Sequence, residues 1–241
     1  METAIKDMPQ FHKYKDTLCE YVQKPDYDDT GFWANKHFYF GEKIEENDFS
    51  QKSFENEPIE KYDNVIASSQ PGAFKSFFST IFNTNGVSFM DYSKQNNAKY
   101  AYNEQIKLLE DAIEDEDKQK AMQSVGRACH FLQDLAQPQH TQKESTLGKF
   151  FNLKTHIDFE NYTQNNTDKI FENLKINNEK HRSNTQLFSD TFIKSNPIEI
   201  SKNNKNEWGN IAKNQINLAV QSTKEFLKNA GEKIFNNSNE S

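Results

Sequence analysis

The chain has 241 residues, 36 of them acidic and 29 basic, for a formal net charge of −7. This length predicts one domain with its own core, and 20 phenylalanines exclude a disordered chain, because such chains rarely carry so many large apolar rings. The acidic balance, without a dense basic face, excludes a general nucleic-acid binder, since such proteins must neutralise phosphates.

Gly and Pro together number 14, which is too few for a turn-dense β protein and favours a helical one. In chain order, helices are predicted over 8–23 (ended by Pro25), 72–82, 92–115, 117–137, from Thr155 onward, more weakly over 167–177 and 186–195, and over 207–235. The stretch from Asp26 to about Gln70 is acidic, aromatic and poorly periodic, which predicts a long irregular loop region. Residues 1–241 are therefore predicted to form a single-domain, all-α multi-helix bundle whose tail, 236–241, frays.

Two helix boundaries follow from local chemistry. Gln137 should leave helical geometry because a proline follows it at Pro138. The hydroxyl of Thr155 could cap a helix start by accepting from the amide of Asp158. Cys19 and Cys129 are too few for a disulfide framework or a thiolate metal site, and Cys129 is expected in the core.

No apolar stretch approaches the roughly 20 residues that cross a bilayer. The first residues, Met-Glu-Thr-Ala-Ile-Lys-Asp, also lack the apolar core of a secretory signal. We therefore expect either a protein made without a signal or a chain that begins downstream of it.

The predicted helix over 117–137 has a wide apolar arc and one narrow polar stripe. The stripe holds Gln123, Arg127, His130, Asp134 and Gln137. Polar stripes normally face solvent, which is one interpretation here. A helix with so wide an apolar arc is expected to be central, however, and the stripe would then face the interior.

Three of the six histidines, His130, His140 and His156, fall within 27 residues. Asp134 follows His130 by four residues, and Glu160 follows His156 by four. On a helix such residues lie only about 40° apart around the axis, so both side chains leave the same face. Two ligands on one helix can bind a metal ion in this way.

Imidazoles with carboxylates and no thiolates suit zinc and, less selectively, other divalent metals. Three ligands, His140, His156 and Glu160, match a catalytic zinc site, which keeps a position open for water, whereas a structural site would more often be closed and rich in cysteine. Asp26 and His37 could join His130 and Asp134 in a second metal centre.

These residues resemble a family, the bacterial zinc-dependent phospholipases C. The resemblance rests on the spacing from His130 to Asp134 and His140 with Pro138 before the last histidine, on His156 followed by Glu160, and on Pro25-Asp26-Tyr27 followed by His37-Phe38-Tyr39. It implies an all-α fold with a trinuclear zinc cluster at the base of a cleft.

By this resemblance, one zinc would be held by Asp26, His37, His130 and Asp134, and a second by His140, His156 and Glu160. Asp134 would bridge to a third zinc, which the family completes with an N-terminal Trp and a His of the first helix. Met1 is not Trp, and His12 lies where the family's ligand does not fall. We therefore expect two zinc ions here, against three in the complete family site.

The related single-strand-specific zinc nucleases share this metal layout but resemble Asn-Leu-His-x-x-Trp-Asp at the last ligand pair. This chain has Lys154-Thr155-His156-Ile157-Asp158-Phe159-Glu160 there, which favours the phospholipase branch. The resemblance implies hydrolysis of a phospholipid to diacylglycerol and a phosphorylated headgroup, by a secreted bacterial monomer acting on a membrane surface. Nucleic acid is not favoured as a substrate.

Clustered divalent ions would neutralise the phosphodiester, lower the pKa of a bound water and stabilise the attacking and leaving oxygens. Asp26 is the candidate general base. Tyr27 and Trp33 could contact a quaternary ammonium headgroup by cation–π interaction, with Asp28 or Asp29 adding charge, or could be ordinary loop packing. Two other functions stay open, namely a nuclease or other phosphodiesterase on the same scaffold and a catalytically degenerate zinc-binding homologue.

Overall fold

A computed structural model describes residues 1–29, 36–39, 41, 97–141, 153–172, 174 and 182–236. These residues contain helices and no strand, so the predicted all-α, single-domain fold is confirmed. The predicted helix over 72–82 and most of the predicted loop region after Asp29 lie outside the described residues. No helix in the described part of the chain is long and apolar enough to cross a membrane.

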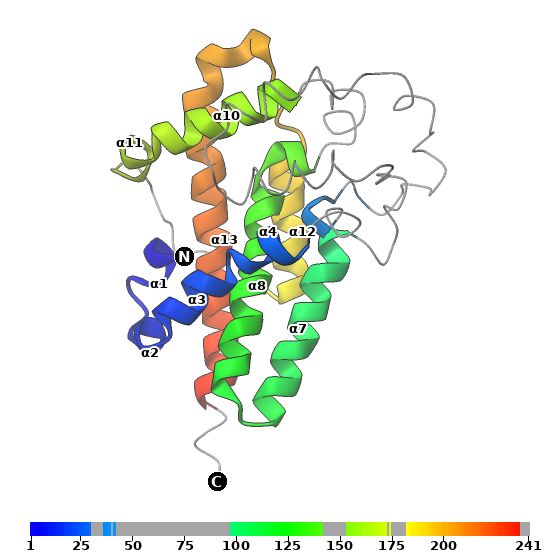
Figure 1. Cartoon of the computed structure of the whole chain (residues 1–241), viewed down its shortest axis with the longest axis vertical. Helices are drawn as coiled ribbons and strands as arrows, with labels where there is room; N and C mark the ends of the chain where they lie inside the picture. Colours follow the sequence, from blue (N-terminus) through cyan, green and yellow to red (C-terminus); the bar gives the residue numbers. More distant parts are fainter. Residues whose placement is uncertain are drawn as a thin grey trace.

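Helix α8 (Lys118–Ala136) is the central element of the bundle (Figure 1). It packs against α3 (Lys15–Tyr21), α7 (Ala98–Glu114), α12 (Asn184–Ser195) and α13 (Trp208–Asn236). No residue from Ala121 to Thr141 is exposed. The polar stripe of this helix is therefore covered rather than open to solvent, since His130 is buried and Gln123, Arg127, Asp134 and Gln137 are partly buried. This agrees better with the prediction from the wide apolar arc than with a solvent-facing stripe.

Shorter helices complete the fold. They are α1 (Glu2–Ile5), α2 (Pro9–His12), α4 (Lys24–Asp28), η5 (Pro138–His140), α10 (Leu153–Asn165), α11 (Thr167–Glu172) and η7 (Lys202–Glu207). The α10 and α11 helices pack against α13, and a separate apolar cluster there includes Phe159, Ile170 and Trp208. This cluster orients the helix that carries Glu160.

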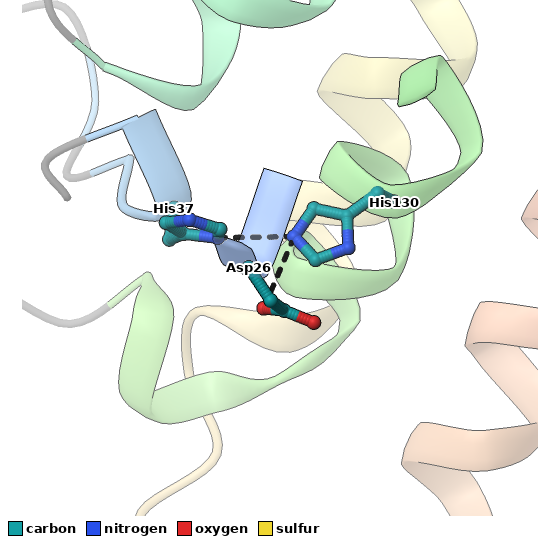
Figure 2. A group of neighbouring side chains, drawn as sticks. All are labelled: Asp26, His37 and His130. Atoms are coloured by element: carbon teal, nitrogen blue, oxygen red, sulfur yellow. Dashed lines mark hydrogen bonds and ion pairs between the residues drawn. The ribbon is translucent and has the colours of Figure 1, made fainter. Parts of the chain in front are cut away.

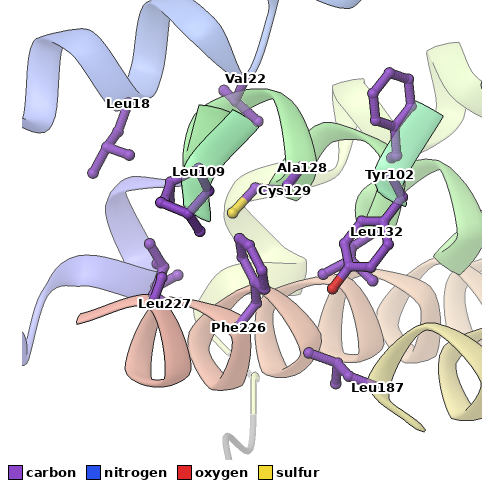
Figure 3. Packing of buried hydrophobic residues seen from close by; sticks show 14 of the residues in the cluster. Leu18, Val22, Tyr102, Leu109, Ala128, Cys129, Leu132, Leu187, Phe226 and Leu227 are labelled. Carbon is purple, nitrogen blue, oxygen red and sulfur yellow. The ribbon is translucent and has the colours of Figure 1, made fainter. Parts of the chain in front are cut away.

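The main core surrounds α8 with side chains from α3, α7, α12 and α13 (Figure 3). Cys129 is fully buried within it, as predicted. Tyr102 and Phe226 are fully buried as well, with ring centroids 5.8 Å apart. Each such large side chain contributes about 1.5–3 kcal/mol on burial, so this core holds α8 in place along its length.

Capping chemistry accounts for several boundaries. Asn97 accepts a 3.0 Å hydrogen bond from the amide of Tyr100, so α7 begins at Ala98 rather than at residue 92. Asp117 caps α8 by accepting from the amide of Lys120. Gln137 is extended, with φ −83° and ψ 111°, which confirms the effect predicted for the residue before a proline.

Two predicted boundaries are wrong. The expected helix over 8–23 is divided into α2 and α3, and Pro25 does not end it but lies in the first turn of α4, where a missing amide hydrogen costs nothing. As a result Asp26 lies in a helical turn, not at the start of a loop. Thr155 is no cap, because α10 already begins at Leu153 and Thr155 is buried within its first turn.

Gly126 allows α3 to approach the backbone of α8. A Cβ placed on Gly126 would lie 2.8 Å from the Cβ of Tyr21, closer than real Cβ atoms come, and 3.2 Å from the amide nitrogen of Val22, which is also tight. Any other residue at this position would therefore push away the end of α3. This contact brings the turn after α3 close to the His130 side of α8.

We predict that Gly126→Ala destabilises the protein by about 1–3 kcal/mol, since overpacking against backbone outweighs the gain of about 1 kcal/mol in helix propensity. Urea unfolding measures the change. Gly209→Ala is the matched control, because the nearest atom to its new Cβ is the movable hydroxyl of Tyr162 at 3.0 Å. Equal stability of the two variants would contradict the prediction.

Candidate metal centre

Four separate segments bring ligand-type side chains to one place beside α8. His130 and Asp134 project from the last two turns of this central helix. Asp26 comes from α4, His37 from the segment 36–39, and His140 from the η5 turn directly after α8. The predicted residues of the first zinc site therefore converge although they are spread over more than 100 positions of the sequence.

His37, His130 and Asp134 form a tight triangle of donor atoms. The Nδ1 atom of His37 lies 3.0 Å from Nε2 of His130 and 2.9 Å from Oδ2 of Asp134. His130 Nε2 lies 3.0 Å from the same carboxylate oxygen. His37 and His130 are buried, and the Asp134 side chain is 13% exposed. Three potential ligand atoms of this kind, two nitrogens and one oxygen that point at one another in the interior, are a typical arrangement for binding a cation.

Asp26 adds a fourth ligand-type group, the second carboxylate, at the rim of this triangle. Its Oδ1 atom lies 3.7 Å from Nε2 of His130, and its side chain is 37% exposed (Figure 2). Ligand atoms of Asp26, His37 and His130 all lie within 4.8 Å of one another, close enough to hold one metal ion. Asp26 therefore faces both the cluster and the surrounding water.

The spacing of these donors fits a divalent first-row ion. Metal–nitrogen and metal–oxygen bonds of about 2.0–2.2 Å at tetrahedral angles separate neighbouring ligand atoms by roughly 3.3 Å. The observed separations of 2.9–3.0 Å within the triangle are slightly shorter, so a small expansion would admit the ion. Two imidazoles and two carboxylates suit zinc among such ions but do not select it alone.

A backbone carbonyl fixes the orientation of His130. Its Nδ1–H donates a 2.8 Å hydrogen bond to the carbonyl oxygen of Val22, in the turn between α3 and α4. In the neutral ring this leaves the Nε2 lone pair directed at His37 and Asp134. Gly126 contributes to this geometry, because it permits the close approach of the Val22 turn. Sequence reasoning could not find this contact, since any residue supplies a carbonyl.

The second oxygen of Asp134 faces His140. Its Oδ1 atom lies 3.4 Å from His140 Nδ1, while Oδ2 contacts the other two histidines. The His140 carbonyl also accepts a 2.9 Å hydrogen bond from the amide of Tyr39, and the Phe38 ring lies 4.8 Å from that of His140. One carboxylate therefore lies between the first cluster and the start of the predicted second one.

The charges of the cluster shift its pKa values strongly. Burial alone would lower the pKa of His130, but the Asp134 carboxylate, with Asp26 and the Val22 carbonyl, raises it to about 9. Burial alone would raise the pKa of Asp134, but the charges of His130 and His37 hold it well below its usual range. Without a metal, His130 therefore carries a proton at pH 7 in the position that a cation would take.

Asp26 behaves differently from Asp134. Its partial burial raises its pKa, an effect that the charge on His130 only partly opposes. A rim carboxylate with a raised pKa accepts a proton more readily than an ordinary aspartate. This shift belongs to the cluster without a metal ion, because a bound cation would lower the pKa of Asp26 again.

The structure describes only some of the other predicted site residues. Trp33 and the side chain of His156 lie outside the described residues, so the group of His140, His156 and Glu160 stays a prediction. Glu160 is half-buried on α10 and is not part of the group formed by Asp26, His37 and His130. Tyr27 is 55% exposed beside Asp26, as a residue that contacts a substrate would be.

Two ion pairs flank the cluster that were not predicted. Asp28 pairs with Arg127, and Asp29 pairs with Lys36 at 3.1 Å. Sequence reasoning offered these two carboxylates as extra charge for a cationic headgroup, but both already face a basic side chain. Their partners were not identifiable from spacing, because the pairs join segments that only the tertiary fold brings together.

Comparisons of the chain with protein-family models, with curated proteins and with solved structures found no match.

We predict that binding of zinc at pH 7 releases about one proton from the cluster, because His130, with a pKa of about 9, must lose its proton to act as a ligand. Calorimetric titration in buffers of different ionisation enthalpy measures the number released. The release should diminish as the pH rises through about 9, where His130 is already neutral. A binding enthalpy that is the same in all buffers at pH 7 would contradict the assignment.

Proposed function

We propose that this chain is a zinc-dependent hydrolase resembling phospholipase C, which cleaves the phosphodiester of phospholipids to diacylglycerol and a phosphorylated headgroup. One observation carries the proposal. The Asp134 carboxylate lies between the pair His37 and His130 on one side and His140 on the other. A bridging carboxylate between neighbouring metal positions is what a multinuclear phosphodiesterase needs.

Zinc is the proposed ion because the donors are imidazole nitrogens and carboxylate oxygens at tetrahedral spacing, without thiolates. When bound, the ions would neutralise the phosphodiester and supply an activated water for in-line displacement. Asp26, His37, His130 and Asp134 would hold the first ion. His140, with His156 and Glu160, would hold the second, an assignment that rests on the motif resemblance.

Proton transfer and headgroup contact are assigned to the chain's own side chains. Asp26, on the water-facing rim of the cluster, would accept the proton of the attacking water, and its partly exposed position supports this role. Tyr27, exposed next to it, would contact the headgroup or the lipid surface. Asp28 and Asp29 are already engaged by basic side chains, so a cationic headgroup would depend mainly on aromatic contacts.

The proposal predicts two zinc ions per chain, measured by elemental mass spectrometry on protein purified without chelator. It also predicts chelator-sensitive release of a phosphate monoester and diacylglycerol from phosphatidylcholine or a related phospholipid. Cleavage of single-stranded DNA with inert phospholipid would replace it by a nuclease on the same scaffold. Well-folded protein that holds no metal would point to a degenerate homologue.

Substitution of the bridging carboxylate supplies a second test. Asp134→Asn should reduce hydrolysis about 100-fold or more, because the amide cannot supply two anionic oxygens. His140→Ala should also abolish activity. His12→Ala is the matched control, since His12 is exposed and its ring lies 3.1 Å from the Ile5 carbonyl oxygen, away from the cluster. Full activity of the His140 variant would refute the two-centre mechanism.

A further inference from the structure

We propose that Arg127 is a positioning residue of the metal centre. It holds α4 through its ion pair with Asp28, and so keeps the Asp26 carboxylate close enough to His130 for both side chains to bind one metal ion. This inference rests on the metal site of the proposed function, and it adds to it a basic residue that touches neither metal nor substrate. Its basis is the geometry of the short helix that carries Asp26.

Asp26 is the least firmly held member of the cluster. It comes from α4, a helix of only five residues, whereas His130 and Asp134 project from a 19-residue helix packed on all sides. Its carboxylate is the most exposed and lies farther from His130, at 3.7 Å, than the 3.0 Å of Asp134. A single helical turn at the surface does not fix a ligand unless something ties it to the bundle.

Arg127 supplies that tie from the helix that carries the histidine. It precedes His130 by three residues on α8, so both side chains leave the same face of a rigid element. Its guanidinium donates to the Asp28 carboxylate and lies 6.0 Å from the centre of the Tyr21 ring. Asp28 is two residues from Asp26 in the same short helix, so the pair fixes α4 relative to His130.

A second ion pair holds the residue that directly follows α4. Asp29 accepts a 3.1 Å hydrogen bond from Lys36, with the two side chains only 10% and 16% exposed. Lys36 directly precedes His37, so this pair ties α4 to the segment of the second histidine. The two carboxylates that follow Asp26 thus connect its helix to both imidazoles of the cluster.

The direction in which Arg127→Ala changes the metal affinity distinguishes a positioning role of Arg127 from a purely electrostatic one. A guanidinium beside a cation site repels the ion, so its removal by Arg127→Ala should tighten metal binding if charge alone matters. Removal also frees the Asp28 carboxylate, which would again favour the cation. If Arg127 positions Asp26, the same substitution weakens binding in spite of both gains.

The experiment measures zinc affinity by competition with a chromophoric chelator, on the full chain. We expect Arg127→Ala to weaken binding roughly three- to tenfold, the range expected for a half-exposed pair acting through a neighbouring ligand. Arg127→Lys should recover part of the loss, because it keeps a cation within reach of Asp28. Lys233→Ala is the control, since it removes an equally simple ion pair, with Glu110, from exposed helix surfaces.

Cobalt substitution reports coordination independently of stability. Loss of the Asp26 ligand should change the visible absorption of the cobalt-loaded Arg127→Ala protein but not that of Lys233→Ala. The double variant Arg127→Ala/Asp28→Ala should bind zinc no more weakly than Arg127→Ala, because the two residues act as one unit.

The possible outcomes distinguish this inference from the proposed function. Wild-type protein that binds no metal overturns both. Wild-type protein that binds zinc, with Arg127→Ala binding it equally or more tightly, leaves the proposed function intact and overturns the positioning role. An unchanged cobalt spectrum in Arg127→Ala likewise overturns the positioning role and leaves the proposed function intact.

Discussion

The buried contact between His130 and Asp134 is the interaction on which the rest of the site depends. Both residues lie on a helix that has no exposed residue from Ala121 onward, so their polar atoms must find partners inside the protein. An unpaired charge there would cost several kcal/mol. The chain meets this requirement by directing His37 at both side chains and the Val22 carbonyl at His130.

The same constraint explains why the cluster suits a cation. The imidazoles of His37 and His130 approach to 3.0 Å, and the Asp134 carboxylate helps to raise the pKa of His130 to about 9, so His130 keeps its proton at neutral pH. A divalent ion would replace this proton and could bind all of these ligand atoms together. In the metal-free protein, the proton on His130 would therefore stabilise the cluster in the position that a metal ion would take.

Stability and geometry are linked at a few specific contacts. Gly126 lets α3 approach α8 closely enough for Val22 to reach His130, and the two ion pairs of Asp28 and Asp29 hold α4 beside it. The partly exposed pair of Asp28 and Arg127 is weak by itself, since such ion pairs contribute about 1 kcal/mol or less. The importance of these contacts lies in orientation, because a ligand displaced by about 1 Å no longer binds well.

The sequence by itself determined the helices of strong periodicity and offered the candidate ligand residues. The α8 helix and its end at Gln137 were predictable, because helical spacing and the effect of a following proline are local properties. The convergence of Asp26 and His37 on His130 was expected only from the motif resemblance, and the tertiary structure brings these side chains together. Only the tertiary structure decided that Pro25 begins a helix, that Val22 orients His130, and that Arg127 and Lys36 engage the carboxylates after Asp26. Those contacts join residues far apart in the chain, and their partners include a backbone carbonyl and common surface charges, which no spacing rule distinguishes.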